Sequence, residues 1–368
     1  MNIVAMGGGT GLAALLQGLK RYVREGSLSS GRRLGKAEPT GEATPLISQL
    51  SAVVGVSDDG GSSGRLRREF RVLPPGDIRN CLVALSEDAT LLSRLFQFRF
   101  TSGRGLKGHS FGNLFLTALT GVMGDFQDAV SASGEVLAIR GRIFPSTMSD
   151  ATLEAVLEDG TIIKGETHIS RSHCPISRIR LVPAQCRPLP QTLEAIREAD
   201  VITIGPGSLY TSLIPNLLVR GVAREMAGCR AARIYIGNLM TQPGETTLYS
   251  ASDHVRAIYD HCGFPIFDYA LFNTKLPSHS LRKQYLAQRS KPVEVDEEKL
   301  ERLGVRLVKA DLLSEDREAR SGKRKLRHHS DRLAKAVLDI GLRHQGTVPK
   351  PIEFATGERS GSTRLVAS

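Results

Sequence analysis

Four short stretches of the sequence combine glycine with small polar or acidic residues, and each follows an apolar run. They cover residues 7–11, 57–64, 205–208 and 237–238. Glycine lets backbone N–H groups approach phosphate oxygens, and a helix that begins after such a turn adds a favourable dipole. The carboxyl ends of parallel strands meet at one edge of a sheet, where ligands bind. The pattern therefore predicts a site for a ligand that carries a pyrophosphate.

The first of these turns, Gly-Gly-Gly-Thr-Gly at 7–11, matches no complete phosphate-binding fingerprint. A dinucleotide fingerprint needs glycine where the chain has Leu12, and a P-loop needs Lys-Ser or Lys-Thr after the turn. Such a turn also serves as a plain tight connection. Together with the later turns it gives the candidate ligand contacts Gly8, Gly9, Thr10, Gly11, Gly205, Gly207, Ser208 and Asn238.

Two adjacent carboxylates, Asp58 and Asp59, follow the second apolar run. Adjacent carboxylates are unfavourable unless cations, hydrogen-bond donors or water meet them. We interpret one as a turn former or helix cap and the other as a contact to a ligand or metal ion. Ser62 and Ser63 add hydroxyl groups to the same candidate site.

Asp77 and Asn80 follow a rigid turn at residues 74–76. One interpretation is a helix start with an acidic first turn. The other brings Asp77 to Asp59, where the two carboxylates would hold Mg²⁺, and makes Asn80 a polar contact of the ligand. The residues alone favour neither interpretation.

His109 and Asn113 flank the start of a further helix, where Ser110 is a candidate N-cap. A single histidine is a weak basis for general base catalysis, and a surface position would explain His109 as well. Neither a Ser/His/Asp order nor a His-x-x-x-His spacing occurs, so nucleophilic hydrolases and zinc peptidases receive little support. His109 and Asn113 are kept as candidate ligand contacts.

The elements that must position these residues alternate between strands and helices. We expect strands at 2–6, 49–56, 201–204, 233–236 and 269–272, and helices at 12–19, 76–86, 88–99, 110–124, 193–197, 215–226 and 252–260, the last with Ser252 as N-cap. Asp159-Gly160 between two alternating runs predicts a β-hairpin. The expected fold is α/β: a Rossmann-like, mostly parallel, doubly wound sheet with a small antiparallel hairpin subdomain at about 150–185.

Residues 1–345 are expected to form a single Rossmann-like nucleotide-binding domain, with a flexible insertion at 24–45 and a disordered tail at 346–368. The 368-residue chain is 40% hydrophobic, which is enough for a sizeable core. Its net charge of +11 is concentrated, because residues 317–350 hold ten lysines and arginines against three acidic residues. Such blocks are more often solvated faces than recognition surfaces, so nucleic acid is not a favoured partner.

Five cysteines without a Cys-x-x-Cys pair predict neither a zinc site nor a disulfide framework. The N-terminus lacks a basic segment and a long apolar stretch, and no run approaches the ~20 apolar residues of a membrane span. We therefore expect a cytoplasmic protein without a membrane span.

Several longer blocks resemble the gluconeogenesis factor family, which belongs to the superfamily of 2-phospho-L-lactate transferase. They are Gly-Gly-Gly-Thr-Gly (7–11), Asp-Asp-Gly-Gly-Ser-Ser-Gly-Arg-Leu (58–66), Leu-Pro-Pro-Gly-Asp-Ile-Arg-Asn-Cys-Leu (73–82), His-Ser-Phe-Gly-Asn-Leu (109–114), Ile-Gly-Pro-Gly-Ser-Leu-Tyr-Thr-Ser-Leu-Ile-Pro-Asn-Leu-Leu-Val (204–219) and Asn-Leu-Met-Thr-Gln-Pro-Gly-Glu-Thr (238–246). The resemblance covers residues 1 to about 340. The chain departs from it in the 24–45 insertion, in the tail, and near Arg289, where glycine is usual.

The resemblance implies a bacterial cytoplasmic protein that is needed for normal cell shape and for growth on gluconeogenic carbon sources. It also implies binding of UDP-sugars, notably UDP-N-acetylglucosamine, with no settled reaction. Two residues are carried over as contacts of the nucleotide sugar. They are Tyr285, seven residues before Pro292-Val293, and Arg327, immediately before His328 in the last helical region.

Three hypotheses arise from these observations. The first is a nucleotide-sugar-binding regulator, expected to be a homo-oligomer, that acts on enzymes of cell-wall precursor supply. The second is a transferase similar to 2-phospho-L-lactate transferase, in which Asp59 and Asp77 hold Mg²⁺, although no nucleophile or base is evident. The third is a nucleic-acid-binding protein that uses residues 317–350, and it predicts binding that collapses with salt.

Overall fold

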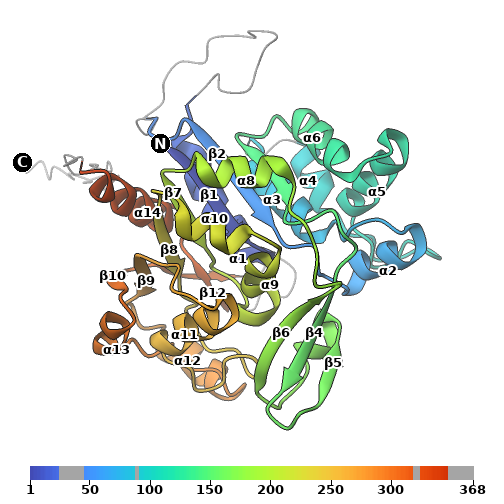
Figure 1. Ribbon diagram of the computed structural model, residues 1–368. Helices are drawn as coiled ribbons and strands as arrows, with labels where there is room; N and C mark the ends of the chain where they lie inside the picture. Colours follow the sequence, from blue (N-terminus) through green and yellow to red (C-terminus); the bar gives the residue numbers. More distant parts are fainter. Residues whose placement is uncertain (25–44, 88–90, 318–323, 347–368) are drawn as a thin grey trace, which may run out of the picture.

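The computed structural model describes residues 1–24, 45–87, 91–317 and 324–346, arranged around a central sheet (Figure 1). The insertion predicted at 24–45 and the tail predicted at 346–368 lie, apart from their end residues, outside the described residues. Helices surround the central sheet, and two smaller groups of strands lie apart from it.

Seven strands form the central sheet in the order β10-β9-β8-β7-β1-β2-β3, and each adjacent pair is parallel. They are β1 (Asn2–Gly7), β2 (Gln49–Val54), β3 (Arg142–Pro145), β7 (Val201–Ile204), β8 (Ala232–Ile236), β9 (Tyr269–Asn273) and β10 (Arg306–Ala310). The strand order reverses between β1 and β7, which is the switch point where doubly wound sheets bind ligands. The predicted α/β, mostly parallel, doubly wound sheet is confirmed.

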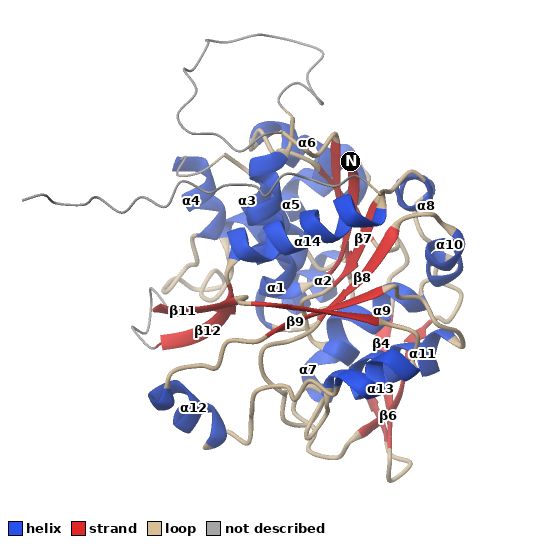
Figure 2. Ribbon diagram, turned by 90° about the vertical axis from the view of Figure 1, so that its left-hand side faces the viewer, coloured by secondary structure: helices blue, strands red, loops and turns tan. Residues whose placement is uncertain are grey.

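Helices cover both faces of this sheet, so alternate residues of a central strand enter two separate cores (Figure 2). In β1, Ile3 and Ala5 pack in one core, whereas Val4 and Met6 pack in the other. The helices of the first core include α1 (Gly9–Leu19), α3 (Gly76–Leu85) and α14 (Ser330–His344). Those of the second core include α8 (Pro190–Arg197), α9 (Ile214–Leu218), α10 (Val222–Gly228) and α11 (Ala251–Cys262).

A small antiparallel sheet projects from one side of the molecule (Figure 1). It contains β4 (Thr152–Leu157), β5 (Ile162–Lys164) and β6 (Ile176–Val182), in the order β5-β4-β6. The predicted hairpin is confirmed. Gly160 adopts a φ of +83° at its turn, a conformation that favours glycine. The third strand, β6, was not predicted.

Three local predictions were wrong. The helix expected at 215–226 is two helices, α9 and α10, because Gly221 has a φ of +87° between them. The N-cap of α11 is Ser250 rather than Ser252, and Ser250 forms a capping box with Asp253. Arg327 lies on a strand, β12 (Arg324–His328), and not in a helical region.

Strands β3 and β10 of the central sheet were not predicted from the sequence, and several further elements were not predicted either. These further elements are α2 (Gly61–Phe70), α6 (Phe126–Val136), α7 (Glu166–Ile169), α12 (His279–Leu286), α13 (Glu297–Arg302) and β11 (Leu313–Arg317), which pairs with β12. The helices predicted at 88–99 and 110–124 are α4 (Leu91–Gln97) and α5 (Phe111–Met123), and Ser110 caps α5 as expected.

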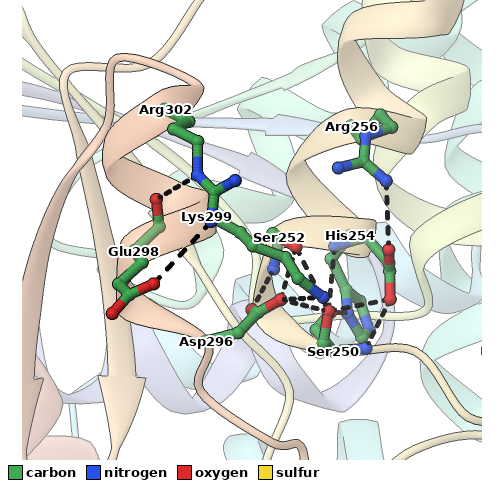
Figure 3. Close-up of polar contacts among 9 residues, drawn as sticks. Ser250, Ser252, His254, Arg256, Asp296, Glu298, Lys299 and Arg302 are labelled. Carbon is green, nitrogen blue, oxygen red and sulfur yellow. Dashed lines mark hydrogen bonds and ion pairs between the residues drawn. The ribbon is translucent and has the colours of Figure 1, made fainter.

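The segment between α12 and β10 is fixed to the start of α11 by Asp296 (Figure 3). The Asp296 carboxylate accepts hydrogen bonds from the hydroxyl groups of Ser250 (2.8 Å) and Ser252 (2.6 Å) and from the Ser252 N–H (2.9 Å). Lys299 Nζ lies 3.4 Å from the same carboxylate. These contacts hold the segment at 292–296, which follows Tyr285, against the start of α11.

We expect Asp296→Ala to lower the free energy of unfolding by about 2 kcal/mol, because several hydrogen bonds to one charged group are lost. Urea unfolding followed by circular dichroism measures this. Glu298→Ala is the control, since Glu298 is exposed and its Oε2 lies 3.8 Å from an Arg302 nitrogen, so its removal should cost at most about 0.5 kcal/mol. Equal losses of unfolding free energy in the two variants would show that the Asp296 contacts do not stabilise the fold.

Candidate functional site

A cavity of about 500 Å³ lies at the carboxyl edge of the sheet, beside the switch point between β1 and β7. Its walls come from turns that follow β1, β2, β7 and β8, and from α3, α7, α12 and β12. The lining residues are Gly8, Gly9, Thr10, Gly11, Ala14, Asp58, Asp77, Glu166, Pro206, Gly207, Ser208, Ser212, Asn238, Leu239, Met240, Gln242, Tyr285, Leu326, Arg327 and His328.

Segments far apart in the sequence therefore meet at one rim. Of the residues predicted from the sequence to contact a ligand or metal ion, the cavity wall contains Gly8, Gly9, Thr10, Gly11, Asp58, Asp77, Gly207, Ser208, Asn238, Tyr285 and Arg327. The wall does not include Asp59, Ser62, Ser63, Asn80, His109, Asn113 or Gly205. Most side chains of the second group form hydrogen bonds with other parts of the protein.

The turns after β1 and β7 touch each other through backbone atoms. A Cβ on Gly11 would overlap the Pro206 carbonyl, so only glycine permits this approach. Asn238 fixes the second turn from the end of β8. Its Oδ1 accepts from the Gly207 N–H (3.2 Å) and its Nδ2 donates to the Gly207 carbonyl (2.9 Å). The Asn238 side-chain amide therefore stabilises the turn after β7.

Asp77 lies at the N-terminus of α1. Its Oδ2 accepts a hydrogen bond from the Gly9 N–H at 2.7 Å, and Asn80 Nδ2 lies 3.5 Å from its Oδ1. Burial raises the pKa of Asp77 to about 6 against the lowering effect of the Gly9 N–H, and nearby Asp58 raises it further. A carboxylate thus occupies the place to which the helix dipole attracts anions.

Asp77 and Asp59 are the pair expected from the sequence, but Asp58 is the residue that lines the cavity with Asp77. Asp59 Oδ1 instead accepts hydrogen bonds from Thr167 N–H (2.9 Å) and Thr167 Oγ1 (2.6 Å). Gly165 leaves room for this contact, because a Cβ there would overlap the Asp59 carboxylate. Asp59 therefore ties α7 to the main sheet.

Glu166, the first residue of α7, is a cavity residue that the sequence analysis missed. Its carboxyl group makes no hydrogen bond or ion pair within the described residues. Burial raises its pKa to about 9, with further contributions from Asp58 and Asp77. No local signal in the sequence marks this position, because Glu166 follows a hairpin strand and is brought to the site by tertiary contacts such as that between Asp59 and Thr167.

Ser62, His109 and Asn113 form a buried cluster between α2 and α5. Ser62 Oγ lies 3.0 Å from His109 Nδ1 and accepts a hydrogen bond from Asn113 Nδ2 at 3.1 Å. Burial lowers the pKa of His109, and nearby Arg65 lowers it further. These side chains lie outside the cavity wall, and the hydrogen bond between Ser62 and Asn113 connects α2 to α5.

Tyr285 and Arg327 enter the cavity from the C-terminal region. The Tyr285 hydroxyl accepts from the Leu326 N–H at 3.2 Å, and its ring packs in a small cluster with Leu239, Met240 and Leu313. The exposed Arg327 guanidinium makes no hydrogen bond or ion pair in the described part of the chain. Burial lowers the pKa of the neighbouring His328 to about 4, so His328 is uncharged at neutral pH.

Among the described residues that line the cavity, Arg327 is thus the cationic side chain at neutral pH, and the carboxylates of Asp58 and Asp77 line the same cavity. Among the residues that the structure describes, no group of three or more His, Cys, Asp or Glu side chains could hold a metal ion. No described helix is long and apolar enough to cross a bilayer. A cation in this cavity would need oxygen atoms from a bound ligand.

Comparison with known proteins gives a consistent set of relatives. Residues 3–313 match the family model described as 2-phospho-L-lactate transferase CofD. The chain is 44% identical to the gluconeogenesis factor of Halalkalibacterium halodurans over 92% of this chain and 96% of that protein. It is 40% identical to the gluconeogenesis factor of Bacillus subtilis over 92% and 98% of the two chains. A crystal structure of a Bacillus halodurans protein superposes with a TM-score of 0.81, at 44% identity, covering 92% and 99% of the chains.

The raised pKa of Glu166 makes stability depend on pH. Between pH 4.5 and 9 the unfolded chain has released a proton that the folded chain keeps, so this group lowers stability as pH rises, by up to about 1.4 kcal/mol per pH unit. Glu166→Gln should flatten that fall in urea unfolding between pH 5 and 8 in EDTA. The exposed Glu158→Gln serves as the control, and parallel curves for wild type and Glu166→Gln would contradict the prediction.

Proposed function

Because the chain belongs to the 2-phospho-L-lactate transferase CofD family, we propose that it binds a UDP-sugar, with UDP-N-acetylglucosamine as the first candidate, in the cavity at the switch point. The observation that carries this proposal is the convergence of the glycine turns after β1 and β7 with Arg327 around one cavity. An N-terminal helix turn and a guanidinium are the groups that proteins use to hold a diphosphate.

Each part of the cavity then has a role in binding. Thr10 and Gly11 belong to the first turn of α1, whose N–H groups lack partners within the helix. Arg327 can bond two phosphate oxygens at once, and its charge offsets part of the charge of the diphosphate. Tyr285 is held by the Leu326 N–H and offers its ring to the sugar or ribose.

The cellular role that fits this binding is regulation. Two relatives are named gluconeogenesis factor, and we propose that this chain acts likewise in growth under gluconeogenic conditions and in maintaining cell shape. In this proposal the UDP-sugar reports the supply of wall precursors in the cytoplasm, and the bound form acts on enzymes of that supply as a homo-oligomer. Because the Arg327 side chain is exposed, the bound ligand remains accessible from solvent.

Isothermal titration with UDP-N-acetylglucosamine should show saturable binding, and Arg327→Ala should weaken it about tenfold or more, because a charged hydrogen-bonding group is lost from the phosphate. Lys325→Ala is the matched control: it removes the same charge two residues away on the same face of β12, outside the cavity wall. Absence of heat with wild type at millimolar ligand would refute the proposal.

The carboxylates of the wall pose an electrostatic problem for an anionic ligand. Asp58 and Asp77 both line the cavity, and the raised pKa of Asp77 reflects its burial and crowding with Asp58. Mg²⁺ is commonly held by one or two carboxylates together with phosphate oxygens of the substrate, so the two side chains fit such an ion. We propose that Asp58 and Asp77 bind Mg²⁺ together with the diphosphate, which the ion helps to neutralise.

This arrangement predicts that Mg²⁺ strengthens nucleotide binding by wild type about tenfold relative to EDTA. Asp77→Asn keeps an oxygen that can accept from the Gly9 N–H but removes the charge, so it should bind at least as tightly as wild type in EDTA and gain little from Mg²⁺. Asp59→Asn should retain the full effect of Mg²⁺, because Asp59 contacts Thr167 instead. A full Mg²⁺ effect in Asp77→Asn would contradict the assignment.

The same carboxylates favour a second candidate function, transfer of a group from a nucleotide-activated donor. A metal ion beside the diphosphate would stabilise the leaving group in such a reaction, and the family is described as a transferase. An assay with nucleotide-activated phospholactate and a deazaflavin acceptor distinguishes the candidates. Product formation would establish the transferase, whereas intact nucleotide binding without product would favour the regulator.

A further inference from the structure

A second cavity, of about 260 Å³, adjoins the main one at the same edge of the sheet. Asn238 and Leu239 line both cavities and therefore form the boundary between them. The second cavity lies between the carboxyl ends of β9 and β10 and residues 292–295, which are held in place through Asp296. A diphosphate in the main cavity leaves this space free.

The walls of the second cavity are largely apolar. They include Phe272, Leu276, Pro292, Val293 and Val295. Phe272 is buried and its ring packs directly against the backbone of Gly237, whereas Leu276 is 63% exposed. An apolar space with a few polar groups is the usual environment for an aromatic ring of a ligand, and a ring there would cover the exposed leucine.

The cationic side chains of this cavity are already paired. Lys275 Nζ lies 3.4 Å from Asp311 Oδ2, and Lys309 forms an ion pair with Glu297. The second cavity therefore offers a phosphate group no unpaired cation among the described residues, in contrast to the main cavity with Arg327. The unpaired guanidinium of Arg327 therefore favours the diphosphate in the main cavity. The second cavity is better suited to an uncharged part of the ligand.

One polar side chain of the second cavity is available to a ligand. Asn273 is committed, because its Oδ1 accepts from the N–H groups of Leu312 (3.0 Å) and Lys275 (3.3 Å). Thr274 donates its N–H to the Ala310 carbonyl (2.9 Å), but its hydroxyl makes no hydrogen bond in the described part of the chain. A hydroxyl can donate to or accept from the edge of a heteroaromatic ring.

We propose that the second cavity receives the nucleobase of the nucleotide whose diphosphate occupies the main cavity. The Thr274 hydroxyl bonds the edge of the base, Val293 packs against its ring, and the ribose crosses the boundary formed by Asn238 and Leu239. This inference rests on the proposed function, since the base is placed relative to the bound diphosphate.

Val293→Phe tests the proposal by filling the second cavity. Titration in Mg²⁺ should show an affinity for UDP-N-acetylglucosamine that is about tenfold lower or more, with an unchanged affinity for pyrophosphate, which needs only the main cavity. Val122→Phe, at a position of α5 that is 82% exposed, is the matched control and should leave both affinities unchanged.

Thr274→Val tests the proposed nucleobase site if the Val293→Phe variant does not fold. Thr274 is exposed and the replacement has the same shape, so the fold is retained. Affinity for UDP-N-acetylglucosamine should fall about threefold to tenfold, again without change for pyrophosphate. Independently, photoactivated 5-azido-UDP bound to wild type should label peptides that contain residues 272–276 or 292–295, and labelling elsewhere would overturn the proposal.

The results separate this inference from the proposed function. Wild-type affinity for UDP-N-acetylglucosamine in both variants would overturn the base site and leave the UDP-sugar site intact. An equal loss for pyrophosphate would do the same, because the substitution would then act through the main cavity. Wild type that binds neither ligand would refute the proposed function itself, and the base site with it.

Discussion

The contact between two backbone turns, one after β1 and one after β7, is the constraint on which the rest of the site depends. Gly11 lies so close to the Pro206 carbonyl that any side chain would separate the turns. The first turn begins α1, and the second is held by both ends of the Asn238 amide. Strand order reverses between these two strands, and the turns that follow them open onto a shared cavity.

The N-terminus of α1 attracts negative charge to this cavity, and carboxylates of the wall already lie there. Asp77 bonds the first N–H of α1, the position from which a helix N-terminus holds phosphate in many nucleotide-binding proteins. Burial raises the pKa of this carboxyl group, because ionisation is costly away from water. A folded chain gains nothing in stability from crowding Asp58, Asp77 and Glu166 around one space. The arrangement makes physical sense when a cation, a proton or both accompany an anionic ligand.

The sequence could predict the parts of this site that are formed mainly by backbone atoms. Strands buried on both faces read as continuous apolar runs, and the glycine turns after β1, β2, β7 and β8 follow directly from them. The direction of individual side chains was harder to predict than the position of the turns. Whether Asp58 or Asp59 enters the cavity is decided by Thr167, 108 residues from Asp59. Helix α2 has no apolar periodicity, because its buried face is mostly Ser62, Ser63 and Gly64, and Glu166 becomes a cavity residue only through tertiary contacts.

Arg289 has a strained backbone in the turn between Tyr285 and the segment at 292–296. It has a φ of +60°, in the left-handed region, which costs a residue with a side chain about 1–2 kcal/mol relative to glycine. The turn is nevertheless closed by hydrogen bonds from Gln288 and Ser290 N–H groups to the Tyr285 carbonyl, and the buried Ser290 hydroxyl donates to the Thr241 carbonyl at 2.6 Å. The arginine side chain is exposed to solvent, so the strain is confined to its backbone. These hydrogen bonds hold the turn that connects Tyr285, a residue of the cavity wall, to the segment at 292–296.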